Sequence, residues 1–205
     1  MVKINNKNHW ETVYETKQPN EVSWTQENPK TSLDFIRKTH LGKTAKIIDI
    51  GGGDSKLVDF LLEEGYEDIT VLDISANALE RAQKRLGKKA EKVSWIVSDI
   101  IDFIPETIYD IWHDRATFHF LTTEKQIKKY TDSIEKWVSN YFIIGTFSEI
   151  GPTKCSGLDI KQYSEMDIEN QFSNHFKKIK CIKENHITPF ETKQNFIFCV
   201  LKKIN

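Results

Sequence analysis

Cysteine is scarce in this sequence: Cys155, Cys181 and Cys199 are the three among 205 residues. Their number is odd, their spacing is wide, and no C-x-x-C pair occurs. This excludes the disulfide framework of small secreted domains and a zinc knuckle. We therefore expect reduced cysteines in a reducing compartment. We also predict no bound metal, because no His, Cys and Asp residues cluster at metal-ligand spacing.

Long apolar runs are missing as well. The longest, such as residues 196–201, fall far short of the ~18 residues that a membrane-spanning helix needs. Residues 1–10 are polar and rich in Asn, and they lack the apolar stretch of a secretory signal. We therefore expect a soluble cytoplasmic protein without a membrane partner.

An excess of charge of one sign is also absent. The sequence has 29 Lys and Arg against 30 Asp and Glu, for a net charge of −1. This balance argues against a dedicated nucleic-acid or membrane-surface binder. The local cluster Lys177, Lys178, Lys180 and Lys183 is more typical of a solvated strand face than of a partner site. With 39% hydrophobic residues, the chain is expected to be one globular domain of residues 1–205.

Apolar runs alternate with amphipathic segments along most of the chain. This alternation predicts βαβ units and a parallel sheet with helices on both faces. In the tail, two strand-like stretches predict an antiparallel pair at one edge of the sheet. The expected strands are 45–50, 69–73, 93–97, 108–113, 141–147, 175–184 and 194–202, and the expected helices are 31–40, 54–65, 75–87, 122–137 and 165–172.

A glycine turn, Gly51-Gly52-Gly53, follows the first expected strand directly. Glycines let the backbone approach a ligand closely, and the next helix offers free N–H groups at its start. A tight turn without a ligand is the alternative. The dinucleotide fingerprint G-x-G-x-x-G would require a third glycine at Lys56, so pyrophosphate binding is disfavoured.

Acidic residues lie at the carboxyl ends of three consecutive strands: Asp49, Asp73 and Asp99. In a parallel sheet these ends would line one crevice. Asp73 follows Gly51 by 22 residues, the usual place for a carboxylate that accepts hydrogen bonds from ribose hydroxyls. Three carboxylates suit a ligand with hydroxyls and amines and without phosphate. Solvated strand ends or helix caps are the alternative for Asp73 and Asp99.

This combination resembles the class I S-adenosylmethionine-dependent methyltransferases over about residues 44–148. Their first motif is matched by Asp49, Gly51 and Gly53, whereas its third glycine is Ser55 here. The resemblance implies an α/β, Rossmann-like fold with a mostly parallel seven-stranded sheet, helices on both faces and an antiparallel C-terminal strand pair. It also implies S-adenosyl-L-methionine as the cofactor.

The resemblance assigns roles to individual residues. It implies that Asp73 holds the ribose hydroxyls, that Asp99 and Ile100 border the adenine, and that Asp49 orients the methionine end. The full set of expected cofactor-binding residues is Asp49, Gly51, Gly52, Gly53, Asp73, Ile74, Asp99, Ile100, Asp114 and Trp24.

The methyl acceptor is expected near the segment after the fourth strand. There Asp114, Arg115 and His119 are the polar residues best placed near the donor methyl, and we predict that they are catalytic. A local ion pair or helix cap is the alternative for Asp114 and Arg115, and a packing histidine is the alternative for His119. The segment lacks the Pro-Pro of amino-methylating DNA enzymes and the glutamate pair of arginine methyltransferases, which disfavours both substrate classes.

The flanks resemble a bacterial-type subgroup loosely similar to the thiopurine and tellurite-resistance methyltransferases. The segments that carry this similarity are His9-Trp10, Glu21–Trp24, Cys155–Leu158 and His186–Phe196. We therefore expect methyl transfer to a small molecule or a protein side chain. A catalytically silent protein that binds S-adenosylmethionine and regulates a partner is the alternative. A nicotinamide-dependent oxidoreductase is disfavoured by Lys56.

The N-terminal segment, residues 1–40, is expected to form a helical lid over the S-adenosylmethionine-binding core of residues 44–148, and residues 149–205 are expected to form a C-terminal helix and antiparallel strands. Its first 29 residues contain Trp10, Tyr14 and Trp24 but few aliphatic side chains. We predict that they fold over the donor, with Trp24, Thr25 and Gln26 nearest the sulfonium, where an indole face attracts the cation. Packing of Trp24 on the 31–40 helix is the alternative.

Overall fold

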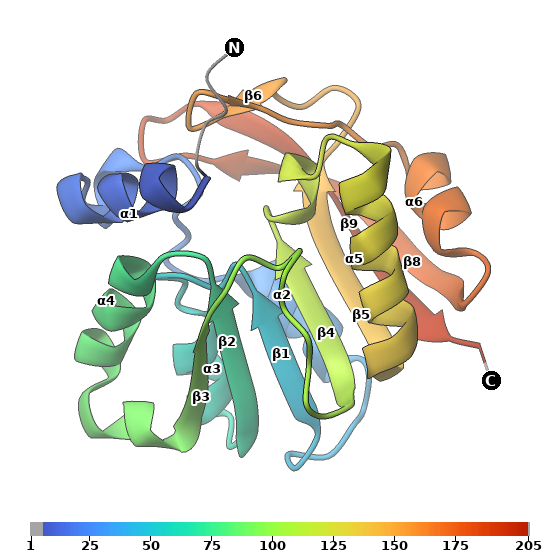
Figure 1. The fold of residues 1–205 in the computed structure, drawn as a ribbon, viewed down its shortest axis with the longest axis horizontal. Coiled ribbons are helices and arrows are strands. Elements are labelled where there is room, and N and C mark those ends of the chain that lie inside the picture. The colour runs from blue at the N-terminus through green and yellow to red at the C-terminus, as the bar shows by residue number, and fades with distance from the viewer. Residues whose placement is uncertain (1–5, 205) are drawn as a thin grey trace.

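The computed structural model describes residues 6–204, which build a seven-stranded sheet between layers of helices (Figure 1). The strand order is β3-β2-β1-β4-β5-β9-β8. The strands are β1 (Lys46–Ile50), β2 (Asp68–Asp73), β3 (Val93–Val97), β4 (Tyr109–Arg115), β5 (Val138–Phe147), β8 (Phe176–Ile187) and β9 (Lys193–Lys203), with β6 (Lys154–Cys155) and β7 (Leu158–Asp159) forming a separate small hairpin. The helices are α1 (Asn6–Thr16), α2 (Lys30–Arg37), α3 (Leu57–Glu63), α4 (Ala76–Leu86), α5 (Glu124–Trp137) and α6 (Glu165–Phe172), and three short 3₁₀ turns are η1 (Pro19–Glu21), η2 (Gly87–Lys92) and η3 (Phe118–Phe120).

The direction of the strands follows from their connections. Strands β1 to β5 pair in parallel because helices connect most of them, whereas the tight β8–β9 turn forces an antiparallel pair. Strand β9 also pairs antiparallel with β5. The expectation of a mostly parallel seven-stranded sheet with an antiparallel C-terminal pair is therefore confirmed.

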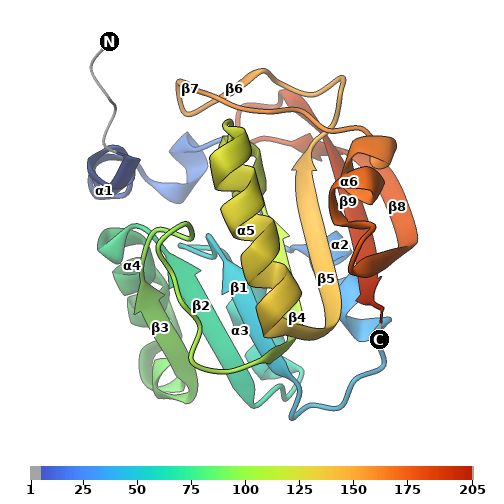
Figure 2. The same cartoon turned by 45° about the vertical axis from the view of Figure 1, so that its right-hand side comes forward.

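Helices cover both faces of the sheet (Figure 2). Neighbouring side chains of a strand point to opposite faces, so Ile47 and Ile48 of β1 enter different cores. Ile48 packs with Ile127 and Ile134 of α5, while Ile47 packs with residues of α2 and α3 such as Leu33. Both faces are buried, which explains why the parallel strands read as continuous apolar runs.

Two helix starts are where the sequence places them. The Ser75 hydroxyl accepts a hydrogen bond from the Ala78 N–H at 3.2 Å and caps α4. Thr123 caps α5 in the same way, and Gln126 completes a capping box. Helix α3 begins later than expected, at Leu57, because the glycine turn takes up the residues through Lys56.

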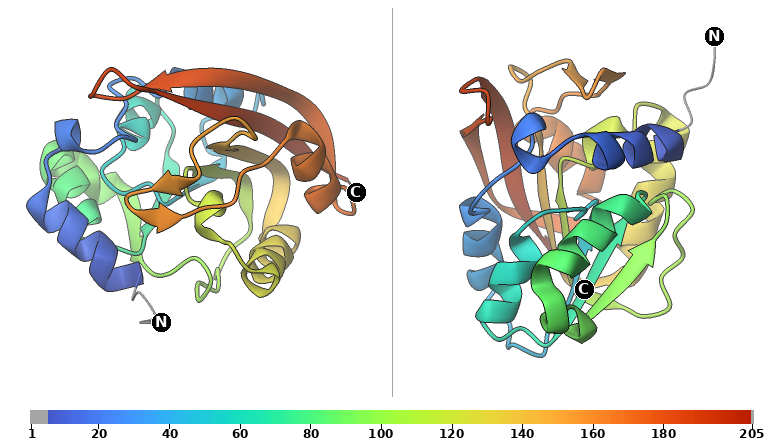
Figure 3. Two further views of the ribbon diagram at one scale, coloured as in Figure 1. Left: turned by 90° about the horizontal axis from the view of Figure 1, so that it is seen from above. Right: turned by 90° about the vertical axis from the view of Figure 1, so that its left-hand side faces the viewer.

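The N-terminal segment contains α1, a helix for which the sequence pattern gave no bounds, although a helical segment was expected within residues 1–40. Figure 3 shows α1 and the β6–β7 hairpin on the side toward which the carboxyl ends of the parallel strands point.

The prediction that the cysteines are reduced was wrong for Cys181 and Cys199, because these two form a disulfide between β8 and β9. The strand register sets them directly opposite, with Cα atoms 4.1 Å apart. Cys155 is a free, buried thiol.

Within residues 6–204, none of the helices combines the length and apolar character that a membrane crossing requires.

Candidate active site

A cavity of about 560 Å³ opens at the carboxyl ends of the parallel strands. From β1 the chain proceeds to β2 and β3 on one side and later to β4 and β5 on the other. Such a reversal of strand order separates the loops above the sheet, and ligands of open α/β folds bind there. The volume is within the usual range for small-molecule sites.

Most of the predicted cofactor-binding residues border this cavity. Those that line it are Asp49, Gly51, Gly52, Asp73, Ile74, Asp99, Ile100 and Trp24. Gly53 and Asp114 are not among the lining residues. The structure thus brings together the three strand ends and the glycine turn, as the sequence predicted, and their individual contacts with a donor stay predictions.

The glycine turn needs its glycines for conformation and for space. Gly51 and Gly53 have φ angles of 63° and 44°, in the left-handed region that side chains disfavour. A Cβ at Gly51 would collide with the Thr117 hydroxyl, and one at Gly53 would lie 2.9 Å from both Asp73 Oδ2 and the Tyr14 hydroxyl. The side chains of Thr117, Asp73 and Tyr14 can therefore lie this close to the turn only because Gly51 and Gly53 have no side chain.

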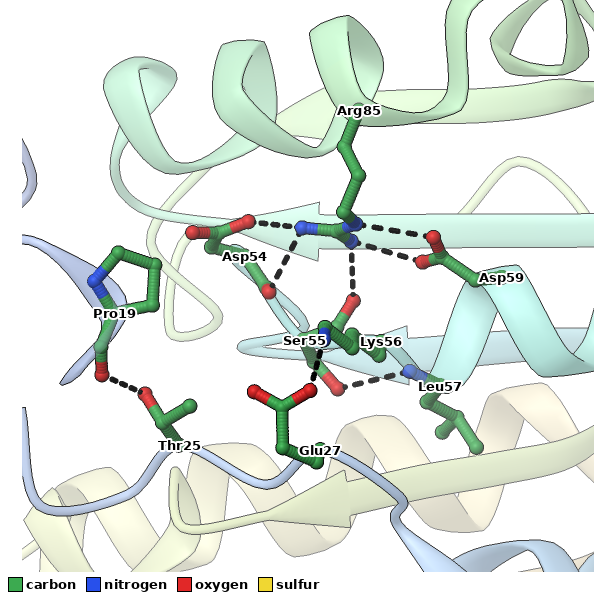
Figure 4. Close-up of polar contacts among 9 residues, drawn as sticks. All are labelled: Pro19, Thr25, Glu27, Asp54, Ser55, Lys56, Leu57, Asp59 and Arg85. Atoms are coloured by element: carbon green, nitrogen blue, oxygen red, sulfur yellow. Dashed lines mark hydrogen bonds and ion pairs between the residues drawn. The ribbon is translucent and has the colours of Figure 1, made fainter. Parts of the chain in front are cut away.

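Arg85 of α4 holds the end of the glycine turn (Figure 4). Its Nη2 donates to the Ser55 carbonyl at 2.8 Å and to Asp59 Oδ2 at 2.9 Å, and its Nη1 contacts the Asp54 carboxylate. Glu27 of the N-terminal segment forms an ion pair with Lys56 at the same turn. No sequence motif pointed to Arg85, since its partners lie about thirty residues earlier.

Asp73 has one carboxylate oxygen engaged and one free. Oδ1 accepts the Ser75 N–H at 2.8 Å, the Ile74 N–H also acts on the carboxylate, and Oδ2 has no further hydrogen bond of ordinary geometry within residues 6–204. Burial raises the pKa of Asp73 to about 7, and the negative charges of Asp49 and Glu11 add to this rise. A buried carboxylate with a free oxygen is suited to accept a ligand hydroxyl.

Asp49 belongs to a buried hydrogen-bonded chain. Its Oδ1 lies 2.6 Å from His113 Nδ1, and His113 Nε2 lies 2.8 Å from the Ser32 hydroxyl. These contacts connect β1, β4 and α2 and fix the orientation of the Asp49 carboxylate beneath the turn. Sequence reasoning missed His113 because its role depends on the pairing of β1 with β4.

Asp114 lies on the other face of the sheet, away from the cavity. Its Oδ2 accepts the Tyr130 hydroxyl at 2.5 Å, and its Oδ1 accepts the N–H groups of Thr117 and Phe118 at 3.0 and 3.2 Å. The side chain is fully buried, which raises its pKa to about 6. The geometry therefore does not support an acceptor-facing role, and it indicates that Asp114 shapes the turn after β4.

Replacement of Asp114 should reduce stability. We expect Asp114→Ala to lower the free energy of unfolding by about 3 kcal/mol, because the Tyr130 hydroxyl and two N–H groups lose their buried acceptor. Urea unfolding measures this change, and Asp132→Ala, on the exposed side of α5, is the control. An Asp114→Ala variant with normal stability and no turnover would instead restore the catalytic assignment.

His119 is a packing residue in this structure. Its ring stacks on Phe147 with centroids 4.5 Å apart, and neither ring nitrogen has a hydrogen-bond partner within residues 6–204. Burial, together with the charge of Arg115, lowers its pKa to about 3, so the ring is neutral. His119 does not line the cavity, which does not support the predicted catalytic role.

Arg115 does line the cavity, unlike Asp114 and His119. Its Nη1 donates to the Trp24 carbonyl at 2.9 Å, and its guanidinium carbon lies 5.0 Å from the centre of the Phe196 ring. Burial lowers the pKa of Arg115 to about 10, so the group still carries a positive charge at neutral pH. Its Nε and Nη2 atoms are buried without a hydrogen-bond partner in the described chain.

Aromatic side chains of the N-terminal segment form one wall of the cavity. The Trp10 ring centre lies 5.2 Å from that of Phe120, 5.5 Å from Trp24 and 6.4 Å from Tyr14. All four residues line the cavity. Trp24 thus packs on rings of α1, and its contact with a sulfonium stays a prediction.

Glu11 anchors α1 to the start of α4. Its carboxylate accepts hydrogen bonds from the Ser75 hydroxyl at 2.8 Å and from the N–H groups of Ala76 and Asn77 at 2.9 and 3.1 Å. A carboxylate at a helix N-terminus satisfies free donors and the helix dipole. The sequence did not predict this anchor, because no pattern in residues 6–16 defined the bounds of α1 or the helix on which it docks.

Comparison with known proteins identifies the core of the chain. Residues 47–140 match the family model described as a methyltransferase domain. Residues 47–140 of this chain are therefore identified as a methyltransferase domain. This confirms the resemblance seen in the glycine turn and the acidic strand ends, as well as S-adenosylmethionine as the cofactor of the domain.

Curated relatives extend beyond this chain. A malonyl-[acyl-carrier protein] O-methyltransferase from Anoxybacillus flavithermus is 30% identical over 125 residues, which are 58% of this chain and 47% of that protein. The human EEF1A lysine methyltransferase 2 is 20% identical over 86% of this chain and 76% of its own length. The chain spans about half or less of the length of the first curated relatives that it matches.

Solved structures share the fold. The N-methyltransferase NodS from Bradyrhizobium japonicum, in complex with S-adenosylhomocysteine, superposes with a TM-score of 0.72 at 15% identity, covering 98% of this chain and all of that one. At this identity the similarity establishes the fold and leaves the acceptor open.

Proposed function

We propose that this protein transfers a methyl group from S-adenosylmethionine to a small-molecule acceptor by in-line displacement. The observation that carries the proposal is the free Oδ2 of Asp73 beside the bare glycine turn, in a cavity that also has an aromatic wall. The first two features suit the donor's ribose and methionine ends. The wall suits a sulfonium and an apolar acceptor.

Enclosure of the cavity supports a small acceptor. Helix α1 is anchored by Glu11, and the Trp24 carbonyl accepts a hydrogen bond from Arg115, so the N-terminal segment covers the strand ends. Methyl transfer from a sulfonium benefits from exclusion of water and from alignment of the two reacting atoms. A relative named for a lysine of eEF1A makes a protein side chain the second outcome of the test.

Two ionisable residues that line the cavity in the described part of the chain, Cys155 and Tyr14, are poorly suited to act as a general base. Burial raises the pKa of the Cys155 thiol to about 12 and that of the Tyr14 hydroxyl further above its usual value. Arg115 is a cation there. We infer that the acceptor atom is already unprotonated when it binds. The enzyme then needs only to align this atom with the donor methyl group and to exclude water from both.

Labelled methyl transfer tests this function. The full chain is incubated with methyl-tritiated S-adenosylmethionine and with either the low-molecular-weight or the protein fraction of a cell extract. We expect label in the low-molecular-weight fraction, and we expect its loss with Asp73→Asn. Label only in protein would move the acceptor class to side chains.

The competing functions predict different results. Binding of S-adenosylhomocysteine without transfer to either fraction would favour the catalytically silent alternative. Binding of NAD without binding of S-adenosylhomocysteine, measured by calorimetry, would contradict the proposed function altogether.

A further inference from the structure

One edge of the Arg115 guanidinium has no partner in the protein. Nη1 donates to the Trp24 carbonyl, whereas Nε and Nη2 have no acceptor within residues 6–204. Nε and Nη2 lie side by side on the guanidinium and point the same way. This is an edge that binds both oxygens of a carboxylate at once.

A buried arginine with unpaired donors destabilises the folded protein when no ligand is bound to it. Buried charges in proteins are normally paired and hydrogen-bonded, because desolvation of an unpaired ion is strongly unfavourable. The carboxylates that act electrostatically on Arg115 are already engaged: Glu184 accepts the Thr31 hydroxyl at 2.5 Å, and Asp49 contacts His113. The protein therefore keeps a cation with two free donors beside the cavity, with carboxylates in its surroundings but no ion pair to either of them within residues 6–204.

The surroundings of Arg115 place it at the acceptor end of the cavity. Phe196 below it belongs to β9, and Glu184 belongs to β8. The donor residues Asp73 and Asp99 follow β2 and β3, which lie on the opposite side of β1 in the sheet. Arg115 itself is on β4, so it lies on the other side of β1 from Asp73 and Asp99.

We propose that Arg115 binds a carboxylate of the methyl acceptor through Nε and Nη2, and that the acceptor is a small carboxylic acid with an apolar body. The carboxylate serves as an anchor, while the methyl group goes to another atom that the aromatic wall holds near the donor. Because Trp24 covers Arg115 through its carbonyl, entry of the acceptor requires movement of that segment. This proposal rests on the function proposed above and names the class of its acceptor.

Simple acids and their amides test the proposal in the full chain. Phenylacetate and 3-phenylpropionate are titrated into protein saturated with S-adenosylhomocysteine, alongside phenylacetamide and 3-phenylpropanamide. We expect the acids to bind about 10- to 100-fold more tightly than the amides, and Arg115→Met to remove this preference. Equal binding of acids and amides, or no binding of either acid, would overturn the proposal.

A second experiment tests whether Arg115 binds the carboxylate of the acceptor or that of the donor. S-adenosylhomocysteine carries an amino-acid carboxylate, whereas 5′-methylthioadenosine lacks it. We expect Arg115→Met to bind both with the affinity of the unaltered chain. A loss of affinity for S-adenosylhomocysteine alone would assign Arg115 to the donor and overturn the proposal, while methyl transfer as a function would stand.

Further variants separate binding from folding. Arg37→Met removes an exposed arginine outside the cavity and should leave the preference for acids intact. Arg115→Lys keeps the charge without the paired donors and should bind the acids with intermediate affinity. If Arg115→Met does not fold, the Nε–H resonance of Arg115 in the unaltered chain decides: phenylacetate shifts it if the proposal holds, and an unchanged resonance at saturating phenylacetate would refute it.

Discussion

Asp73→Asn should weaken binding of S-adenosylhomocysteine by roughly 1.5–3 kcal/mol, the range for hydrogen bonds to a charged group. The substitution keeps the size of the side chain and an oxygen that accepts the Ser75 N–H. It replaces the free Oδ2 by an amide group or an uncharged oxygen, which binds ribose hydroxyls less well. Calorimetry measures the change, and unchanged affinity would show that Asp73 does not contact the donor.

The raised pKa of Asp73 adds a pH dependence to this prediction. Its folded pKa of about 7 means that the carboxylate loses its charge as the pH falls from 8 to 6. Donor hydroxyls bind the charged form better, so affinity for S-adenosylhomocysteine should fall over this range. Asp73→Asn should show a flat profile, and a parallel decline in both proteins would assign the dependence to another group.

The same shift has the opposite effect on stability without the donor. A carboxyl group whose pKa is raised on folding destabilises the folded state at pH values above its unfolded pKa, and this cost grows until the pH passes the folded pKa. We therefore expect Asp73→Asn to have a higher melting temperature than the unaltered protein at pH 8. The difference should disappear toward pH 4.

Removal of residues 1–29 should abolish binding of S-adenosylhomocysteine at concentrations that saturate the full chain. These residues supply Trp10, Tyr14 and Trp24 to the cavity wall. Without them the strand ends face water, and the apolar and cation–π contacts to the donor are lost. Circular dichroism establishes that the truncated chain remains folded. A folded, truncated chain with full affinity would exclude the lid role.

A point substitution tests the same lid with less disturbance. Glu11→Ala removes the carboxylate that joins α1 to the start of α4, and it should lower donor affinity by about 1 kcal/mol, the usual value of a helix cap. Glu15→Ala, an exposed position on the same helix, is the matched control. Donor-induced protection of the first 30 residues from protease, and a change in tryptophan fluorescence, should weaken in Glu11→Ala and persist in Glu15→Ala.

Residues at the ends of parallel strands could be predicted from the sequence. Asp49, Asp73 and Asp99 each follow an apolar run, and the alternation of strands and helices implies parallel strands. Parallel strands end on the same edge of a sheet, so their terminal residues line one crevice regardless of exact packing. The glycine turn could also be predicted from the sequence, because its conformation depends on the glycines themselves.

The face on which a strand residue lies could not be read with the same certainty. The apolar run 108–113 suggested an earlier end to the fourth strand, whereas β4 continues to Arg115. Because side chains alternate along a strand, neighbouring Asp114 and Arg115 point to opposite faces, one toward Tyr130 and one toward the cavity. Only the structure separates the structural residue from the one available to a ligand.

The sequence by itself determined the sheet architecture, the glycine turn and the acidic strand ends, because each depends on local patterns and on the common direction of parallel strands. Tertiary structure alone decided contacts between distant segments: the Asp49–His113 pair, the Glu11 anchor and the Cys181–Cys199 disulfide. These contacts depend on strand register and on how α1 docks. Both are set by the packing of the whole chain, which no short stretch of sequence contains.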